Sequence, residues 1–217
     1  MSEEHIPFIF TKSNSSEVEE KAIALRDEML KRRSLRFFSE EEVSKETIEA
    51  LLKVASSAPS GANKQPWTFV AISNPELKKR IRAAAEKEEQ SFYGGRASDT
   101  WLADLAPLGT DWQKPFLETA PWIVVVFKKS LDYDGSKNYY VQESVGIACG
   151  FLIAAIHQAG LVTLTHTPSP MNFLSEILER PANEKPYLLL PIGFPAANAT
   201  VPNIKKKDAS EVLFYFE

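Results

Sequence analysis

The segment from Tyr139 to Ala159 constrains the fold more than any other part of the sequence, because it is a long and mostly apolar run. Its length, and Gly160 directly after it, predict an α-helix that ends at the glycine. The helix would be apolar around most of its circumference, which is too hydrophobic for the surface of a monomer. We therefore expect it to lie in the centre of the fold or at a contact between subunits.

The rest of the chain alternates between predicted helices and strands. Ser16 and Glu19 have the spacing of a capping box, so we expect a first helix from Ser16 to about Arg32. Two further helices are expected after Ser44 and after Asn74, and a short one near 173–178. Strand-like apolar runs lie at 67–73, 121–127, 161–165, 187–193 and 212–216. The alternation predicts an α+β fold with a central mixed β-sheet surrounded by helices.

We expect residues 1–217 to form a single domain with three irregular stretches. Residues 1–14 are an irregular N-terminal arm, and residues 203–217 form a C-terminal extension that is basic and then strand-like. Residues 94–115 are interrupted by Gly94, Gly95, Pro107 and Gly109. Few apolar contacts hold such a segment closed, so we expect it to be loose until a ligand orders it.

The composition argues against several classes of protein. A net charge of −4 and a pI near 5.6 argue against nucleic-acid binding. No run reaches ~18 apolar residues and the N-terminus lacks the basic start of a signal peptide, so we expect no membrane segment and a cytoplasmic location. Cys149, the only cysteine, lies in an apolar run and is expected in the core. No His or Cys partner lies at ligand spacing from His166, so no metal site is expected.

Two segments have the composition of ligand-binding loops. Residues 58–67 join a helix-like run to a strand and contain two prolines, which fix φ and remove two amide donors. The N–H groups of Ser60, Gly61 and Ala62 are candidates to bind a flat ligand, because glycine allows the main chain a close approach. Residues 32–36 carry three guanidiniums and one hydroxyl, a set that suits a phosphate. Either pattern alone is more often an ordinary turn or a solvated helix end.

In this order and spacing the two segments are similar to the flavin-binding half of the nitroreductase superfamily. Within that superfamily the chain resembles the iodotyrosine deiodinases from about Lys31 to about Lys207. The resemblance implies a nitroreductase-like fold and an intertwined homodimer, in which the C-terminal extension reaches the partner subunit. It also implies that FMN is the cofactor and that each flavin site is built from both chains.

The resemblance assigns FMN phosphate to the arginine cluster and the flavin ring to the proline-containing turn. Thr167 matches a threonine beside flavin N5, whose hydroxyl supports one-electron chemistry, and is the implied catalytic residue. His166 replaces a threonine of vertebrate members and is expected to contact flavin through its backbone only. Lys206 replaces an arginine, which keeps the charge but loses the bidentate fork. The full implied cofactor set is Arg32, Arg33, Ser34, Leu35, Arg36, Pro59, Ser60, Gly61, Thr165, His166, Thr167 and Lys206.

Glu89, Tyr93 and Lys114 are the candidate substrate clamp. Glu89 and Tyr93 are four residues apart and would share one face of a helix. The family has the same Glu-x-x-x-Tyr pair, followed by a lysine in a similar Trp…Asp-Leu…Leu…Trp-x-Lys frame, here 101–114. The resemblance implies that Glu89 binds the α-ammonium group of a halotyrosine and Lys114 its α-carboxylate, while Tyr93 adds a hydrogen bond. The Ala62 N–H would bind the phenolate oxygen.

The implied activity is FMN-dependent reductive dehalogenation of iodo-, bromo- and chlorotyrosine to tyrosine and halide, by stepwise one-electron transfer. No Gly-x-Gly-x-x-Gly fingerprint follows a strand, so we expect a separate electron donor that draws on NAD(P)H. The residues identify neither that donor, nor the proton donor, nor the preferred halogen. Two alternatives stay open: a generic NAD(P)H-dependent FMN nitroreductase or quinone reductase, and a non-catalytic protein that binds flavin or tyrosine derivatives.

Overall fold

The computed structural model describes residues 5–217, and the chain divides into two compact units, Met1–Arg32 and Arg33–Glu217. In the first unit, residues 5–14 contain no helix or strand, as expected, and helix α1 (Ser15–Lys31) follows. The remaining residues of the predicted arm, 1–4, lie outside the described residues.

The capping box of α1 lies two residues before the predicted one. The Asn14 side chain accepts the Glu17 N–H at 2.9 Å, and the Glu17 carboxylate accepts the Asn14 N–H at 3.3 Å. The assignment to Ser16 and Glu19 is therefore wrong, because Asn14 and Glu17 have the same required spacing and start the helix earlier.

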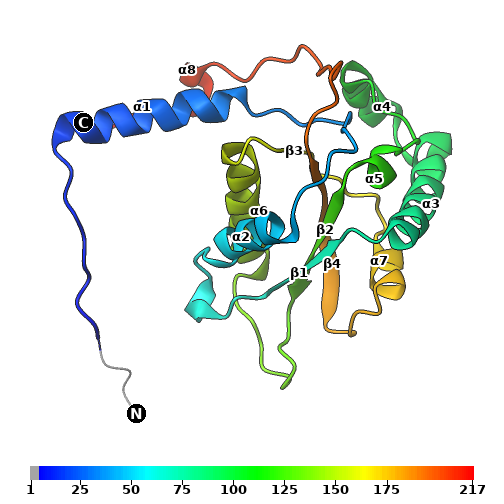
Figure 1. Ribbon diagram of the computed structural model, residues 1–217, viewed down its shortest axis with the longest axis horizontal. Helices are drawn as coiled ribbons and strands as arrows, with labels where there is room; N and C mark the ends of the chain where they lie inside the picture. The colour runs from blue at the N-terminus through cyan, green and yellow to red at the C-terminus, as the bar shows by residue number, and fades with distance from the viewer. Residues whose placement is uncertain (1–4) are drawn as a thin grey trace. The chain divides into compact units, whose positions relative to one another are not determined.

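A four-stranded antiparallel sheet forms the centre of the second unit, in the order β1-β2-β4-β3 (Figure 1). Its strands are β1 (Trp67–Ile72), β2 (Trp122–Lys129), β3 (Val162–Thr163) and β4 (Glu184–Gly193). The predicted α+β class is confirmed. The expected mixed sheet is not observed, because all the strands pair antiparallel. Within residues 5–217, parallel pairing is limited to the isolated bridge between Ser34 and Thr163.

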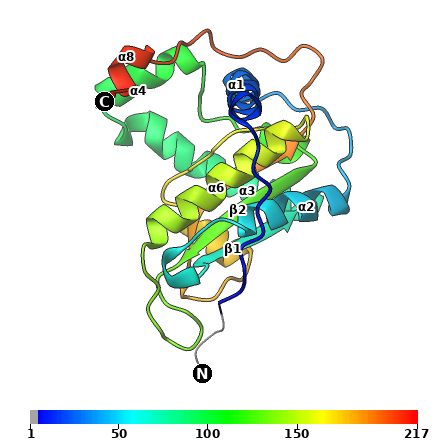
Figure 2. The ribbon, with the colours of Figure 1, turned by 90° about the vertical axis from the view of Figure 1, so that its left-hand side faces the viewer.

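Helices cover both faces of this sheet (Figures 1 and 2). Helices α2 (Lys45–Ser56) and α6 (Val141–Gln158) pack over the face that carries Val124 and Val126 of β2. Helices α3 (Pro75–Ser91), α5 (Phe116–Thr119) and α7 (Asn172–Ile177) pack over the face with Ile123, Val125 and Phe127. Because alternate side chains of a strand point to opposite faces, the unbroken apolar run of β2 serves two cores at once.

The helix starts predicted for α2 and α3 are confirmed. Ser44 Oγ accepts the Thr47 N–H at 3.1 Å, and the Asn74 side chain accepts the Leu77 N–H at 3.0 Å. Both are N-cap hydrogen bonds, which satisfy amides that have no partner inside the helix.

Helix α6 is central along one face and exposed along another. Its buried face includes Cys149, whose pKa burial raises to about 12, so the thiol is a neutral core group as expected. Ile147 and Phe151 are exposed, at 42% and 40% of their surface. The predicted helix is thus confirmed, and it presents large apolar side chains outside the core of this chain.

Two stretches differ from their predicted character. The 94–115 stretch contains a regular helix, α4 (Asp99–Leu105), which Ser98 caps through the Trp101 N–H. The strand predicted at 212–216 does not form; α8 (Ala209–Val212) ends there, and Phe214, Tyr215 and Phe216 are exposed. A strand needs a neighbour for its main-chain groups, and this segment has none in the described part of the chain.

The described residues contain neither a membrane-spanning helix nor a metal-binding cluster. Among residues 5–217, no helix is both long and apolar enough to cross a membrane. Over the same range, His, Cys, Asp and Glu side chains form no cluster of three or more that could hold a metal ion.

Candidate functional site

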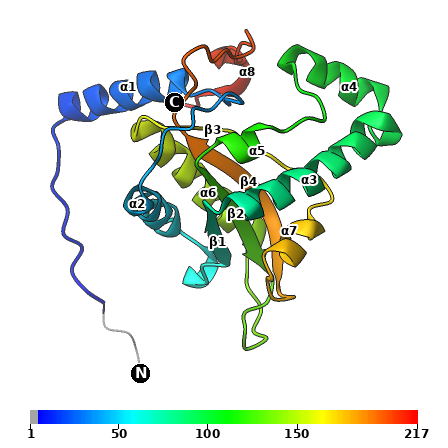
Figure 3. The ribbon, with the colours of Figure 1, turned by 45° about the vertical axis from the view of Figure 1, so that its right-hand side comes forward.

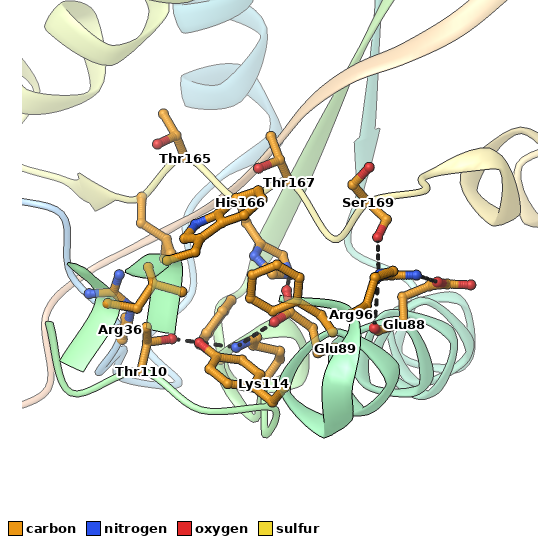
Figure 4. Close-up of a pocket in the computed structure, with 16 residues that line it drawn as sticks. Arg36, Glu88, Glu89, Arg96, Thr110, Lys114, Thr165, His166, Thr167 and Ser169 are labelled. Atoms are coloured by element: carbon orange, nitrogen blue, oxygen red, sulfur yellow. Dashed lines mark hydrogen bonds and ion pairs between the residues drawn. The ribbon is translucent and has the colours of Figure 1, made fainter. Parts of the chain in front are cut away.

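A cavity of about 410 Å³ in the second unit lies among α3, α4, α5 and the segment that follows β3 (Figure 4). Figure 3 shows the ribbon of the elements that carry its wall. It joins the predicted substrate clamp to the last arginine of the cluster and to the threonine-containing segment. The predicted site residues on its wall are Arg36, Glu89, Tyr93, Lys114, Thr165, His166 and Thr167.

The end of α3 positions the clamp residues. After Glu89 the helix continues into a π-helical turn, Phe92–Arg96, which places Tyr93 on the cavity wall. Gly95, at φ 143°, allows the chain to leave the helix toward α4. The Phe92 ring meets the Trp101 ring edge-on with centroids 4.9 Å apart, so an aromatic contact joins the helix end to α4.

Lys114 and Glu89 form a nearly buried ion pair. Lys114 Nζ lies 3.4 Å from Glu89 Oε2, and the two side chains are 4% and 13% exposed. Burial lowers the pKa of Lys114 and raises the pKa of Glu89, and in each case the opposite charge of the partner only partly offsets the burial. Lys114 Nζ also donates to the Asp111 carbonyl. The pair is therefore poorly solvated, and besides Lys114 the charge that stabilises the Glu89 carboxylate within residues 5–217 is that of Arg96.

Tyr93 and Arg36 add two more desolvated groups to the wall. Burial raises the pKa of Tyr93, against a hydrogen bond with Thr110, and lowers the pKa of Arg36. Lys114 Nζ lies 5.6 Å from the centre of the Tyr93 ring. Within residues 5–217 no acidic side chain pairs with the Arg36 guanidinium. A half-buried cation without an acid is suited to the oxygen atoms of a ligand.

His166 presents its side chain to the cavity and its main chain to the sheet. Its N–H donates to the Leu189 carbonyl at 2.9 Å, and its carbonyl accepts the Leu189 N–H at 3.0 Å. Both main-chain groups are thus paired with β4, and the expectation that His166 contacts flavin only through its backbone stays a prediction. The alternation of an extended chain turns Thr165 and Thr167 to the opposite side from His166, and both threonines are exposed (Figure 4).

The second-unit part of the arginine cluster runs beside β3. Ser34 bridges to Thr163, and the Leu35 N–H donates to the Thr163 carbonyl at 3.1 Å. The Arg33 guanidinium donates to the carbonyl of Pro202, where the C-terminal segment begins. This pairing brings Arg36 to the cavity but leaves Arg33, Ser34, Leu35 and the exposed Lys206 off its wall. Arg32 belongs to the first unit.

The proline-containing turn is not part of this cavity. The Gly61 N–H donates to Ser144 Oγ at 3.3 Å, and a Cβ on Gly61 would lie 2.8 Å from the Tyr140 ring. The close approach that this glycine permits is therefore to the start of α6, and not, within this chain, to a ligand. Pro59 and Ala62 are exposed, and Ala62 adopts a left-handed conformation with φ 50°. The predicted residues of this turn thus lie apart from those on the cavity wall.

Sequence reasoning missed Arg96 and Ser169 on the cavity wall. Arg96 pairs with Glu88 at 3.1 Å and donates to the Ser169 carbonyl, so it joins the end of α3 to the segment after Thr167. The only signal was an arginine directly after Gly94 and Gly95, which is too common to identify a site.

Comparison with known proteins identifies the family. A protein-family model described as "Nitroreductase family" matches residues 29–194 of the sequence. The chain is 56% identical to an iodotyrosine deiodinase of Haliscomenobacter hydrossis over 97% of both chains, and 41% identical to iodotyrosine deiodinase 1 of Homo sapiens over 97% of this chain and 74% of that one. A crystal structure of oxidized iodotyrosine deiodinase bound to FMN and 3-iodo-L-tyrosine matches with a TM-score of 0.75 and 31% identity, over 89% of this chain and 99% of that one. The chain belongs to the nitroreductase family and, within it, to the iodotyrosine deiodinases.

Proposed function

We propose that this protein reductively dehalogenates halotyrosines with FMN as its cofactor. The observation that carries the proposal is the nearly buried Glu89–Lys114 pair, 3.4 Å apart on a cavity wall beside Tyr93. A free amino acid carries one charge of each sign, so it offers each member of the pair a new partner. The iodotyrosine deiodinase of similar structure holds FMN and 3-iodo-L-tyrosine together, which supports the same ligands here.

The residues of the second unit fit FMN. Arg36 is a desolvated cation on the cavity wall without an acidic partner in residues 5–217, and the exposed Thr165 and Thr167 line the same cavity. We propose that Arg32, Arg33, Ser34 and Lys206 bind the phosphate and that Leu35 and Arg36 complete this half of the site. Reduced FMN would supply, one at a time, the two electrons that, together with one proton, replace a carbon–halogen bond by a carbon–hydrogen bond and release halide. The Thr167 hydroxyl is the group of this chain that would hydrogen-bond the reacting part of the flavin.

The clamp residues would bind and orient the substrate. Glu89 takes the α-ammonium group, Lys114 takes the α-carboxylate, and Tyr93 donates a further hydrogen bond. Each interaction is strengthened by the low polarity of the site. The substrate would also give each of the two poorly solvated side chains a further partner of opposite charge. Closure of α4 and the Phe92–Arg96 turn over the cavity would then exclude water from the halogenated ring of the substrate. Iodo-, bromo- and chlorotyrosine are all candidate substrates, because an ortho halogen acidifies the phenol and favours the phenolate.

A second copy of this chain would complete the site. The turn with Pro59, Ser60, Gly61 and Ala62 lies outside the cavity of its own chain, so we propose that the partner's turn contributes the ring-side contacts and the amide that binds the phenolate. Many apolar side chains are available for such an interface. They include Phe8, Phe10, Ile147, Phe151, Phe214 and Phe216, all exposed.

On this proposal, residues 1–217 act as one FMN-binding domain of a homodimer. The arm 1–14 and the extension 203–217 would pack on the partner subunit, where the exposed residues 212–216 would find the strand neighbour that residues 5–217 do not provide. Electrons would come from a separate NAD(P)H-dependent protein, since the second unit contains no glycine-rich dinucleotide loop.

The proposal is tested by halide release. FMN-loaded protein is reduced with dithionite under anaerobic conditions and given 3-iodotyrosine, 3,5-diiodotyrosine or a nitroaromatic compound in parallel. We expect one iodide for each carbon–iodine bond lost, with tyrosine as the final product. Rapid reduction of the nitroaromatic without any iodide release would favour the generic nitroreductase instead. Flavin binding without turnover of either compound would favour the non-catalytic alternative.

A further inference from the structure

His166 contains a buried polar atom that the clamp described above leaves without a role. The side chain is 8% exposed, and its ring packs edge-on against Phe116 with centroids 5.6 Å apart. Its Nε2 atom is fully buried and finds no hydrogen-bond partner within residues 5–217. Buried polar atoms are almost always hydrogen-bonded, so an orphan on a cavity wall points to a partner that arrives with a ligand.

The surroundings of His166 keep its imidazole neutral. Burial, with a smaller contribution from the nearby cations Lys114 and Arg36, lowers its pKa to about 3. A neutral imidazole has one nitrogen that donates and one that accepts a hydrogen bond. With the proton on Nδ1, Nε2 is the acceptor, on a side chain that belongs to the cavity wall.

One charged atom near that acceptor belongs to Glu89. Nε2 lies 4.0 Å from Glu89 Oε1, which is too far for a hydrogen bond, while the other oxygen of the carboxylate faces Lys114 at 3.4 Å. A nitrogen placed at ordinary hydrogen-bond distances of ~2.9 Å from both Oε1 and Nε2 would see them at an angle of about 90°, roughly 20° narrower than the tetrahedral angle, a bend that hydrogen bonds tolerate. The separation of the two acceptors is therefore one that a single ammonium nitrogen can bridge.

We infer that His166 is part of the ammonium subsite, where Nε2 accepts a hydrogen bond from the α-amino group of the substrate beside Glu89. The inference rests on the proposed function, and it assigns to His166 a specificity role that distinguishes amino acids from otherwise identical acids. A buried ammonium group has three N–H donors and needs more acceptors than one carboxylate oxygen supplies. A neutral acceptor provides one without attracting Lys114 away from the substrate carboxylate.

The test compares two ligands that differ only in the amino group. These are 3-iodo-L-tyrosine and 3-(4-hydroxy-3-iodophenyl)propanoate, each titrated by calorimetry into FMN-loaded wild type, His166→Leu and His166→Gln, with the change His157→Leu in α6 as a control. We expect His166→Leu to weaken 3-iodotyrosine binding by about 10-fold or more, as for loss of a hydrogen bond to a charged group. The propanoate should change by less than about two-fold. His166→Gln retains an acceptor oxygen and should recover part of the loss, and the control should bind both ligands as wild type does.

Equal weakening of both ligands by His166→Leu, or no weakening of either, would overturn the inference. A second measurement needs no substitution at the site: in ¹⁵N-histidine-labelled wild type, the Nε2 resonance of His166 should shift on addition of 3-iodotyrosine and stay in place with the propanoate. Identical responses to the two ligands would again contradict it. Failure of the wild type itself to bind 3-iodotyrosine would instead remove the proposed function, so the two failures are distinguishable.

Discussion

Two buried glutamates of this molecule have opposite surroundings. Glu184 at the start of β4 has a fully buried side chain and accepts hydrogen bonds from Thr68 at 2.7 Å, Tyr133 at 2.8 Å and Arg180 at 2.7 and 3.1 Å. Glu89 has one ion pair, with Lys114 at 3.4 Å, and faces a cavity. Burial would raise the pKa of both, yet the partners of Glu184 outweigh its burial and lower its pKa, whereas the pKa of Glu89 is raised.

The number of partners separates a structural carboxylate from a ligand-binding one. The Glu184 carboxylate is saturated, and it ties β1, the 130–138 loop and the end of α7 to β4. Glu89 retains an oxygen without a close partner, so a donor group of a ligand can still form a hydrogen bond with it. The comparison therefore predicts that loss of Glu89 affects binding and loss of Glu184 affects stability.

The largest effect is expected from Glu89→Gln. The neutral side chain leaves Lys114 and the substrate ammonium without their shared partner, and such losses typically cost ~2–5 kcal/mol, roughly 30-fold to several thousand-fold in Kd. Binding of 3-iodotyrosine is measured by flavin fluorescence, with FMN occupancy checked by absorbance. Affinity within about two-fold of wild type would refute the role given to Glu89.

Lys114→Met should have the next largest effect. It keeps the apolar stem and removes the charge, while Tyr93 can still donate to the substrate carboxylate, so we expect a loss of about 2 kcal/mol in 3-iodotyrosine binding. The matched ligand is 2-iodophenol, which has no zwitterion and should bind the variant and the wild type alike. A similar loss for both ligands would show that Lys114 supports the cavity rather than the substrate.

Glu184→Gln should produce the reverse result. Arg180 loses its charged partner, which should lower stability by about 1–3 kcal/mol and Tm by roughly 2–12 °C, with unchanged affinity for 3-iodotyrosine. Thermal unfolding followed by circular dichroism measures this. Glu49→Gln, which breaks an exposed ion pair with Lys53, is the control and should change neither property. A Glu184→Gln variant with normal Tm but weakened 3-iodotyrosine binding would contradict the structural role given to Glu184.

The smallest effect is a difference in pH dependence with opposite signs at the two sites. The lowered pKa of Glu184 contributes stability above its ordinary value of 4.5 that is lost on acidification. The raised pKa of Glu89 contributes stability below 4.5 that is lost as pH rises. From pH 3.5 to 7, the Tm of Glu184→Gln should therefore fall relative to wild type, and that of Glu89→Gln should rise. Parallel trends in the two variants would contradict the assigned directions.

Local patterns predicted the elements well and the site only in part. Ser44 and Asn74 identified helix starts because N-capping depends on a few neighbouring residues. The start of α1 was misassigned because two capping patterns overlap within six residues, and only the structure selects Asn14. The prediction of a strand at 212–216 was wrong because strand formation requires a second strand to pair with, which the composition of the segment itself does not show.

The same limit applies to the site residues. The spacing of Glu89 and Tyr93 places them on one helix face, whereas Lys114 was reached through the family resemblance alone. The side chain of His166 faces the cavity because its backbone pairs with Leu189, a contact between segments 23 residues apart that no local pattern contains. Gly61 was correctly singled out for a close approach, but the neighbour in this chain is Tyr140.

The most direct test of the clamp is the crystal structure of the protein with FMN and 3-iodo-L-tyrosine bound, in which the Glu89–Lys114 separation is measured. We predict that the substrate ammonium group lies within hydrogen-bond distance of Glu89 and its carboxylate within that distance of Lys114, with the direct contact of 3.4 Å lengthened. A substrate whose charged groups point elsewhere, with the Glu89–Lys114 contact intact, would contradict the account.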